Sequence, residues 1–261
     1  VLWPKLEMLG ALDFLDAALQ DGRIKRAGFS YHGVAELFQP IVDAYNWDFC
    51  QIQYNYLDEE FQAGRKGLEY AAGKGIGVVV MEPLRGGNLS GELPKEAEAV
   101  FSAASTKRSH AEWALRWVWN HPEVATVLSG MTEPWQLEEN LKIACQAEAG
   151  MMSSDELVRV DQVKKIYRDR QKVPCTKCRY CMPCPVGVDI PGNLEAYNNY
   201  YLFDSEGNRM LAKMFYGTML ADGAKADNCI ECGKCIEHCP QEIQIPQELK
   251  KVAEVLGTAA N

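Results

Sequence analysis

The chain has 261 residues, 47% of them apolar, and a formal net charge of −9. This apolar fraction suffices for a packed core and is too high for a disordered chain. The excess of carboxylates repels phosphate backbones and argues against a nucleic acid partner, and no apolar run approaches the ~20 residues that span a bilayer. The length predicts one large globular domain or two smaller ones.

Strand-like and helical patterns alternate over residues 1–150. Short apolar runs predict strands at residues 23–30, 48–54, 77–81 and 126–128. Apolar residues at helical spacing predict helices at residues 6–19, 34–44, 64–73, 109–120 and 133–145. Ser109 and Thr132 are the expected N-caps of the last two helices. This alternation is typical of parallel strands joined by crossover helices, and so of an α/β fold.

The remainder of the chain has a different character. Ser153 and Glu156 form a capping box that predicts a helix up to about residue 170. Residues 173–250 hold most of the cysteines and an aromatic-rich middle in which we expect one or two helices. We therefore predict a first domain at 1–150, a connecting helix at 151–172 and a cysteine-rich domain at 173–261.

Eight of the ten cysteines fall into two similar runs. In each run, two residues separate each of the first three cysteines from the next, and the fourth cysteine directly precedes a proline. The first run is Cys175, Cys178, Cys181 and Cys184, and the second is Cys229, Cys232, Cys235 and Cys239. The second run has the spacing of bacterial ferredoxins, and the first is one residue shorter in its last gap. Because three thiolates at this spacing can wrap one loop around three irons of a cubane, we predict two 4Fe–4S clusters.

The fourth cysteine of each run is expected to serve the opposite cluster, as in two-cluster ferredoxins. We therefore assign Cys184 to the cluster of the second run and Cys239 to the cluster of the first. Two structural zinc sites are an alternative, although zinc would leave the third cysteine of each triplet unexplained. A disulfide scaffold is less expected in a chain without secretory features. The two isolated cysteines, Cys50 and Cys145, are predicted to be small buried apolar residues.

Four segments of the first domain resemble strand ends of the aldo/keto reductase superfamily. They are residues 27–32, 50–55, 81–87 and 128–130, the last followed by 137–140. Their order and spacing are similar to strands five to eight of that family's TIM (β/α)8 barrel. Together with the cysteine runs, they resemble the branch of the family that carries a C-terminal ferredoxin-type domain. The resemblance implies the second half of a barrel followed by a mainly α-helical ferredoxin-like domain.

The resemblance also implies a nicotinamide cofactor, NAD(P), at the ends of these strands. Ser30 and Gln51 would hold the nicotinamide carboxamide. The loop with Leu84, Gly86 and Gly87 would lie along the pyrophosphate, where glycines allow close backbone approach. The family often stacks a tyrosine on the nicotinamide where this chain has Met81.

The resemblance implies that the adenine end of the cofactor lies at the last of the four segments, residues 128–130 and 137–140. Ser129 and Gly130 would meet a phosphate at a helix N-terminus, and Glu139 and Asn140 would face the adenine. The family's arginine for a 2′-phosphate corresponds to Gln136, so NAD is at least as strongly expected as NADP.

The family's proton-transferring Asp, Tyr, Lys and His belong to the first four strands, which would precede Val1. No catalytic residue is therefore predicted within this chain. At ~30 residues for each of four further units, we expect the whole protein to have roughly 380 residues. Half a barrel would leave two open sheet edges, and pairing with a second copy of the chain is one way to cover them.

The leading hypothesis is an iron–sulfur oxidoreductase that acts on a small carbonyl or alcohol and exchanges electrons with a redox protein through its clusters. Because nicotinamide carries a hydride pair and each cluster takes one electron, a flavin is kept as a further candidate cofactor. The alternatives are a non-enzymatic electron carrier or scaffold with an inactive barrel remnant, and a zinc-stapled interaction module. The oxygen sensitivity of exposed clusters favours the cytoplasm.

Overall fold

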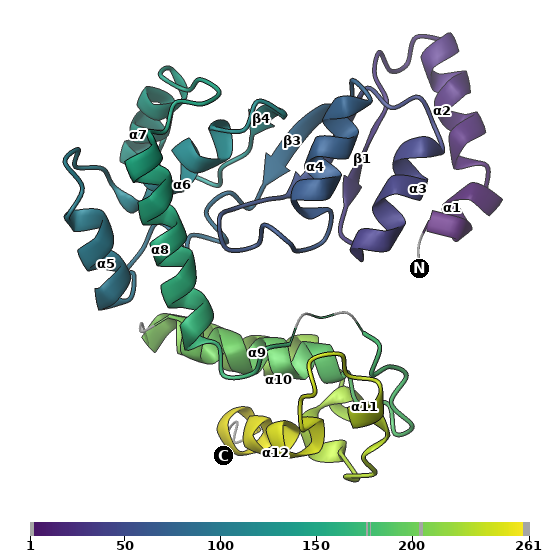
Figure 1. Cartoon of the computed structure of the whole chain (residues 1–261). Helices are drawn as coiled ribbons and strands as arrows, with labels where there is room; N and C mark the ends of the chain where they lie inside the picture. The colour runs from purple at the N-terminus through teal and green to yellow at the C-terminus, as the bar shows by residue number, and fades with distance from the viewer. Residues whose placement is uncertain (1–2, 176, 178, 204–205, 258–261) are drawn as a thin grey trace. The chain divides into compact units, whose positions relative to one another are not determined.

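The computed structural model describes residues 3–175, 177, 179–203 and 206–257 (Figure 1). The chain divides into two compact units, which are taken one at a time below. The first comprises Val1–Gly91 and Ala104–Val160, and the second comprises Glu92–Ala103 and Asp161–Asn261. The predicted domain limits at residues 150 and 172 stay a prediction. None of the helices in the described part of the chain combines the length and apolar character needed to span a bilayer.

The first unit contains a parallel sheet of four strands in the order β1-β2-β3-β4. The strands are β1 (Gly28–Tyr31), β2 (Phe49–Gln53), β3 (Gly77–Met81) and β4 (Val124–Val127). The predicted α/β fold with a parallel sheet is thus confirmed. The first strand begins later than predicted, because Arg23 and Arg26 pair with surface carboxylates before the strand starts.

The helices of this unit are α1 (Trp3–Met8), α2 (Ala11–Gln20), α3 (Phe38–Asp43), α4 (Gly64–Gly73), α6 (His110–Trp119) and α7 (Pro134–Ala144). A short 3₁₀ turn, η1 (Ala35–Leu37), precedes α3. The single helix predicted at 6–19 is wrong: Gly10, with φ of 74°, separates α1 from α2. A left-handed residue of this kind ends one helix and lets the next begin in a new direction.

The predicted N-cap of α6 is confirmed, whereas the predicted N-cap of α7 is wrong. Ser109 caps α6 as predicted, since its hydroxyl accepts a hydrogen bond from the Glu112 N–H at 3.0 Å. Thr132 does not cap α7, because the N-cap position falls on Glu133. The N–H groups of Thr132 and Glu133 donate instead to the Gln136 side chain, at 2.9 and 3.2 Å. A side chain of α7 itself therefore accepts the hydrogen bonds of the backbone N–H groups just before the helix.

The two faces of the sheet have different surroundings. On one face, Cys50, Ile52, Val78 and Val80 are completely buried, and helices α4 and α6 contact the sheet. On the other face, Gln51, Gln53, Val79 and Met81 are only half-buried. The difference follows from the alternation of side chains along each strand. A parallel sheet in a globular protein is normally covered on both faces.

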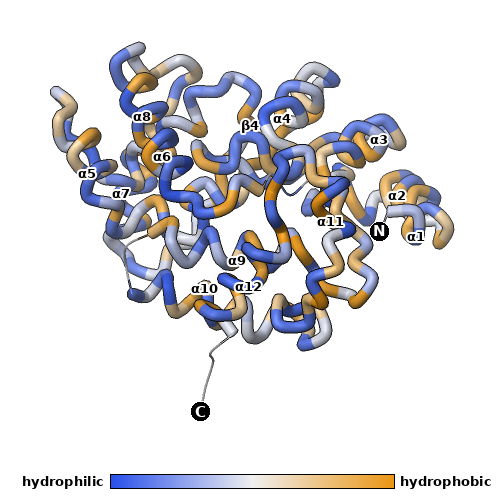
Figure 2. The backbone as a smooth tube through the Cα atoms, turned by 60° about the horizontal axis from the view of Figure 1, so that its bottom comes forward, coloured by the Kyte–Doolittle hydropathy of each residue, from blue (hydrophilic) through white to orange (hydrophobic). Residues whose placement is uncertain are grey.

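The second unit is helical in its described residues. Its elements are α5 (Lys95–Ser102), the C-terminal part of α8 (Ser154–Arg170), α9 (Ile190–Leu202), α10 (Glu206–Met219), η2 (Asp222–Ala224), η3 (Ala226–Asn228), α11 (Lys234–Glu237) and α12 (Ile245–Leu256). Helix α8 starts at the predicted capping box, where the Glu156 N–H donates to the Ser153 hydroxyl. Hydrophobic and hydrophilic residues mix along α9, α10 and α12 (Figure 2), as expected for helices with one buried face.

Helices α5 and α12 were not predicted. Helix α12 carries a clear signal, because Ile245, Leu249, Val252 and Leu256 recur at helical spacing and are all buried. Helix α5 has a weaker signal, with only Ala97 and Phe101 buried.

The Asn198 side chain, on α9, hydrogen-bonds to the backbone of the segment that leads into the first cysteine run. Its carbonyl oxygen accepts hydrogen bonds from the Lys172 and Val173 N–H groups, both at 3.0 Å, and its amide donates to the Val173 carbonyl at 2.8 Å. The side chain is only 7% exposed. These backbone groups have no secondary-structure partner, so the asparagine replaces a strand or helix at this point.

We expect Asn198→Ala to lower the free energy of unfolding by about 2–4 kcal/mol, because it leaves buried backbone groups unsatisfied. The measurement is chemical denaturation followed by circular dichroism. Gln247→Ala, at an exposed position of α12, is the control and is expected to change stability by less than about 0.5 kcal/mol. Equal stability of the two variants would contradict the proposed role of Asn198.

Candidate functional site

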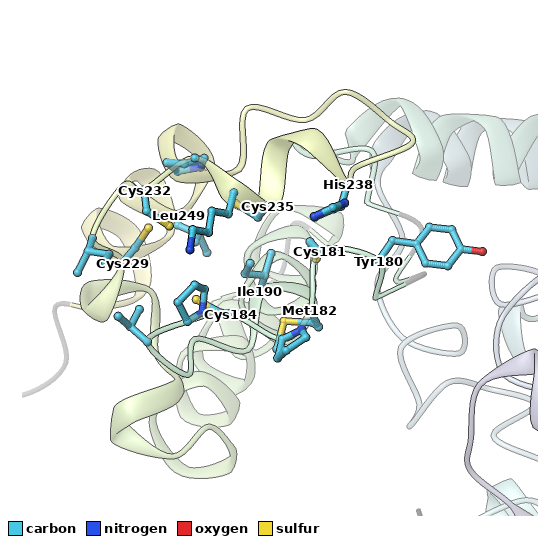
Figure 3. Close-up of a pocket in the computed structure, with 17 residues that line it drawn as sticks. Tyr180, Cys181, Met182, Cys184, Ile190, Cys229, Cys232, Cys235, His238 and Leu249 are labelled. Carbon is cyan, nitrogen blue, oxygen red and sulfur yellow. The ribbon is translucent and has the colours of Figure 1, made fainter.

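A cavity of about 310 Å³ lies where the two cysteine runs meet. Figure 3 shows Cys184 of the first run beside Cys229, Cys232 and Cys235 of the second. These are the four residues assigned to one cluster by the crossed pattern. Cys181 also reaches the wall of this cavity.

A second, smaller cavity of about 20 Å³ has the complementary composition. Cys175 and Cys181 of the first run line it together with Cys239 of the second. Cys178, the remaining residue assigned to this cluster, lies outside the described residues. The structure thus brings together the described cysteines that the crossed pattern groups, while their role as ligands stays a prediction.

The two cysteine loops share one backbone pattern. Lys177 and Arg179 in the first run have φ of 58° and 63°, and the matching residues Glu231 and Gly233 have φ of 52° and 75°. Left-handed residues thus stand at the same two positions of each run. The match shows that the repeated spacing corresponds to a repeated conformation.

The repeat continues beyond the cysteines into the helices. Three residues after the fourth cysteine, Gly187 and Glu242 are again left-handed, with φ of 84° and 53°. Each is followed by an Ile-Pro pair that begins a helix, at Ile190 in α9 and at Ile245 in α12. The one-residue difference between the runs is therefore confined to the gap before the fourth cysteine.

Cys184, Cys229, Cys232, Cys235 and Cys239 carry free thiols. Burial, and then the neighbouring thiols of Cys229, Cys232 and Cys184, raise the pKa of the Cys235 thiol. Binding to a cation would favour the thiolate form of such a group. Within the described ranges, no three cysteine, histidine or carboxylate side chains converge tightly enough to hold a single metal ion. The thiols surround a space rather than one point.

The candidate nicotinamide residues lie on the half-buried face of the sheet. Ser30 of β1 and Gln51 of β2 are direct neighbours in the parallel register. Ser30 is exposed and Gln51 is half-buried. The Gln51 amide donates to the Met81 sulfur at 3.2 Å. The three side chains therefore belong to three adjacent strands on a common face.

The candidate pyrophosphate loop follows β3 and is tightly turned. The Gly87 and Leu89 N–H groups both donate to the Leu84 carbonyl at 3.0 Å. Gly86 and Gly87 are exposed and have φ of 62° and 88°, a conformation that favours glycine. Leu84 is half-buried. The turn accounts for both glycines, and it presents backbone on the surface.

The candidate adenine end gathers at the start of α7. The Asn140 amide donates to the Ser129 hydroxyl at 3.1 Å, so these two predicted residues are in contact. Gln136 caps the helix, and Glu139 is half-buried. A Cβ placed on Gly130 would meet none of the described atoms within 4 Å, so the fold itself imposes no small residue there.

A polar cluster that was not predicted lies next to the candidate pyrophosphate loop. Asn55 and Asp58 follow β2, and they bind the segment around Glu82 and Arg85. The signal that could have revealed it is an asparagine and an aspartate three residues apart directly after a strand, a pattern typical of side-chain-stabilised turns.

Comparison with known proteins identifies both parts of the chain. The sequence profile of the aldo/keto reductase family matches residues 3–165, and that of a 4Fe-4S dicluster domain matches residues 174–244. Because the first match covers more than half of the chain, the protein belongs to the aldo/keto reductase family. Its second part carries the sequence features of a two-cluster iron–sulfur domain. No match was found among curated proteins.

Solved aldo/keto reductases are among the similar structures. The enzyme AKR11C1 from Bacillus halodurans is 23% identical, with a TM-score of 0.47, over 57% of this chain and 53% of that protein. The glycerol dehydrogenase AKR11B4 from Gluconobacter oxydans is 19% identical, with a TM-score of 0.43, over 57% of this chain and 51% of that protein. The chain thus spans about half the length of these structures.

The two isolated cysteines differ from each other. Cys50 is buried as predicted, and burial raises its pKa to about 12. The prediction that Cys145 is buried is wrong, because Cys145 follows the last turn of α7 and is exposed there.

At pH 8 we expect iodoacetamide to alkylate Cys145 in the native protein and to leave Cys50 unmodified, since only an accessible thiolate reacts. Peptide mass spectrometry measures the two sites separately, and unfolding in denaturant should expose Cys50 fully. Labelling of native Cys50 at the rate of Cys145 would contradict its burial.

Proposed function

We propose that the protein is an iron–sulfur oxidoreductase that couples nicotinamide-dependent carbonyl or alcohol chemistry to electron transfer through two 4Fe–4S clusters. The observation that carries this proposal is the pair of cavities, each lined by cysteines of both runs, in a chain of the aldo/keto reductase family. Neither run could complete its cavity alone.

The donor set fits two clusters. Thiolates are the ligands that iron–sulfur clusters take, and such a cluster supplies one-electron transfer when bound. Cys229, Cys232, Cys235 and Cys184 would hold one cluster, and Cys175, Cys178, Cys181 and Cys239 the other. Apolar residues of α9 and α12, such as Ile190 and Leu249, would exclude water from one side of the larger cavity.

We further propose that the four strands correspond to the second half of a (β/α)8 barrel. Support comes from the half-buried sheet face, which carries Gln51, Val79 and Met81, and from the unpaired outer edges of β1 and β4 within the described sheet. Closure by further parallel strands would bury that face and pair both edges. Exposed apolar residues on α7, such as Leu141, support further packing there.

A nicotinamide cofactor would lie across the ends of these strands, where barrel enzymes carry their active sites. It would supply hydride transfer to or from the carbon of a small carbonyl or alcohol. Ser30 and Gln51 would orient its carboxamide, the Gly86–Gly87 turn would approach the pyrophosphate, and Ser129 with Asn140 would meet the adenine end. Gln136 brings no positive charge to a 2′-phosphate, which supports NAD at least as well as NADP.

The electron partner and the compartment belong to the same proposal. A redox protein would exchange single electrons with the clusters, and a flavin is the cofactor class that would reconcile these with hydride pairs. Thiolate ligands would persist in a reducing compartment such as the cytoplasm, where disulfides are rare.

The crossed ligand pattern predicts which cysteine variants lose the same cluster. Cys184→Ala and Cys229→Ala should lose the same cluster, so iron falls from about eight to about four atoms per chain and the same electron paramagnetic resonance signal remains. Cys175→Ala and Cys239→Ala should keep the other signal. Cys145→Ala is the control and should keep both. A Cys184 variant that matches the Cys175 variant would contradict the crossing.

The function as a whole is tested on protein purified without oxygen. We expect iron and acid-labile sulfide in equal amounts, binding of NADH, and loss of the visible cluster absorbance when NADH or a reduced redox partner is added. Zinc without iron would overturn the proposal in favour of a structural module. Clusters without nicotinamide binding would indicate an electron carrier.

A further inference from the structure

A buried polar cluster connects the end of β2 to the loop after β3. Asn55 is fully buried, and Asp58 is 9% exposed. Both residues bind groups of the 82–87 segment, which contains the exposed Gly86–Gly87 turn. The cluster therefore links two neighbouring strand ends through side chains rather than through the sheet.

Asn55 provides the first connection. Its carbonyl oxygen accepts hydrogen bonds from the Leu57 and Asp58 N–H groups, both at 3.0 Å, which closes a turn after β2. Its amide nitrogen donates to the Glu82 carbonyl at 3.1 Å. Glu82 is the first residue after β3, so this bond fixes the point where the loop leaves the sheet.

Asp58 provides the second connection. One oxygen of its carboxylate accepts hydrogen bonds from the Gln53 amide at 3.0 Å, the Asn55 amide at 3.1 Å and the Arg85 Nε at 3.1 Å. The side chains of Arg85 and Asp58 are only 18% and 11% exposed. The ion pair is thus largely shielded from water, where charge-assisted hydrogen bonds are strongest.

The loop needs such support because of its conformation. Glu82 and Arg85 have φ of 56° and 50°, and they precede the left-handed Gly86 and Gly87. Left-handed conformations are unfavourable for residues with a side chain and persist where the surroundings fix them. The two non-glycine residues in this conformation are the two that Asn55 and Asp58 hold.

We infer that Asp58 is a positioning residue that, with Asn55, holds the loop after β3 in the shape required by the pyrophosphate of a dinucleotide. The inference rests on the proposed function. Asp58 acts through Arg85, which directly precedes Gly86 in the chain. A carboxylate next to an anion site is unfavourable by charge alone, so its presence is explained by the geometry it maintains.

The variant Asp58→Asn separates position from charge. Removal of a negative charge near a pyrophosphate would tighten binding if charge alone mattered. Loss of the Arg85 anchor should weaken binding instead, and we expect the Kd of NADH and of ADP to rise about tenfold. Adenosine lacks the pyrophosphate, so its affinity should stay within about twofold of the native value.

Two further measurements keep the test decisive. Hydrogen–deuterium exchange of the amides at residues 84–89 should quicken about tenfold in Asp58→Asn without any nucleotide. Arg85→Lys keeps the charge and loses the Nε contact, so it should weaken the binding of NADH and of ADP in the same way. This variant replaces Asp58→Asn if the latter fails to fold. Asp43→Asn breaks an exposed ion pair with Lys74 and is the control expected to change neither quantity.

The outcomes are distinguishable. Tighter or unchanged NADH and ADP binding in folded Asp58→Asn overturns the inference, even if loop exchange quickens. An equal loss of adenosine affinity overturns the inference as well, because the substitution would then weaken nucleotide binding in general rather than at the pyrophosphate. If the native protein binds neither NADH nor ADP, the proposed nucleotide site is wrong and the inference falls with it.

Discussion

The mutual dependence of the two cysteine runs governs the second unit. Each cavity draws cysteines from both runs, so neither can form until residues 175–184 and 229–239 lie against each other. The long segment between them is folded into α9 and α10, which pack together and bring the runs face to face. The apolar core of this unit, with Val188, Leu194 and Leu249, lies directly behind the cysteines. The same packing therefore builds this core and the cavities.

Left-handed residues with side chains recur at both candidate sites, and ion pairs accompany several of them. Lys177 pairs with Glu195 of α9 at 2.8 Å, and Arg179 reaches Asp189 at 3.4 Å, just before the same helix. Arg85 pairs with Asp58 in the first unit. In each case a charged residue in an unfavourable backbone conformation is tied to a neighbouring element. At the position of the second run that matches Arg179, Gly233 adopts the same conformation without a side chain.

Local sequence patterns predicted the parts of the fold that depend on them. The apolar runs located all four strands, because a strand in a parallel sheet needs continuous apolar character. The cysteine spacing indicated that the two runs meet, and the described cysteines of both runs do line shared cavities. The helix break at Gly10 and the cap at Glu133 were missed because single polar or flexible residues have several local roles. Asn55 and Asp58 indicate a local turn after β2, but the pairing of Asp58 with Arg85 joins two strand ends whose proximity exists only in the folded sheet.

The half-buried face of the sheet and the cysteine cavities pose opposite physical problems. Gln51, Val79 and Met81 are half-buried and combine polar and apolar side chains on one face, a mixture that would suit the ligand-facing interior of the proposed barrel. The cysteine cavities instead have a closed apolar rear wall and a thiol lining, which suits a group held permanently. A substrate and a dinucleotide that come and go need the first kind of surface. A cluster that only exchanges electrons would need the second, and the proposed function would assign one kind of surface to each unit.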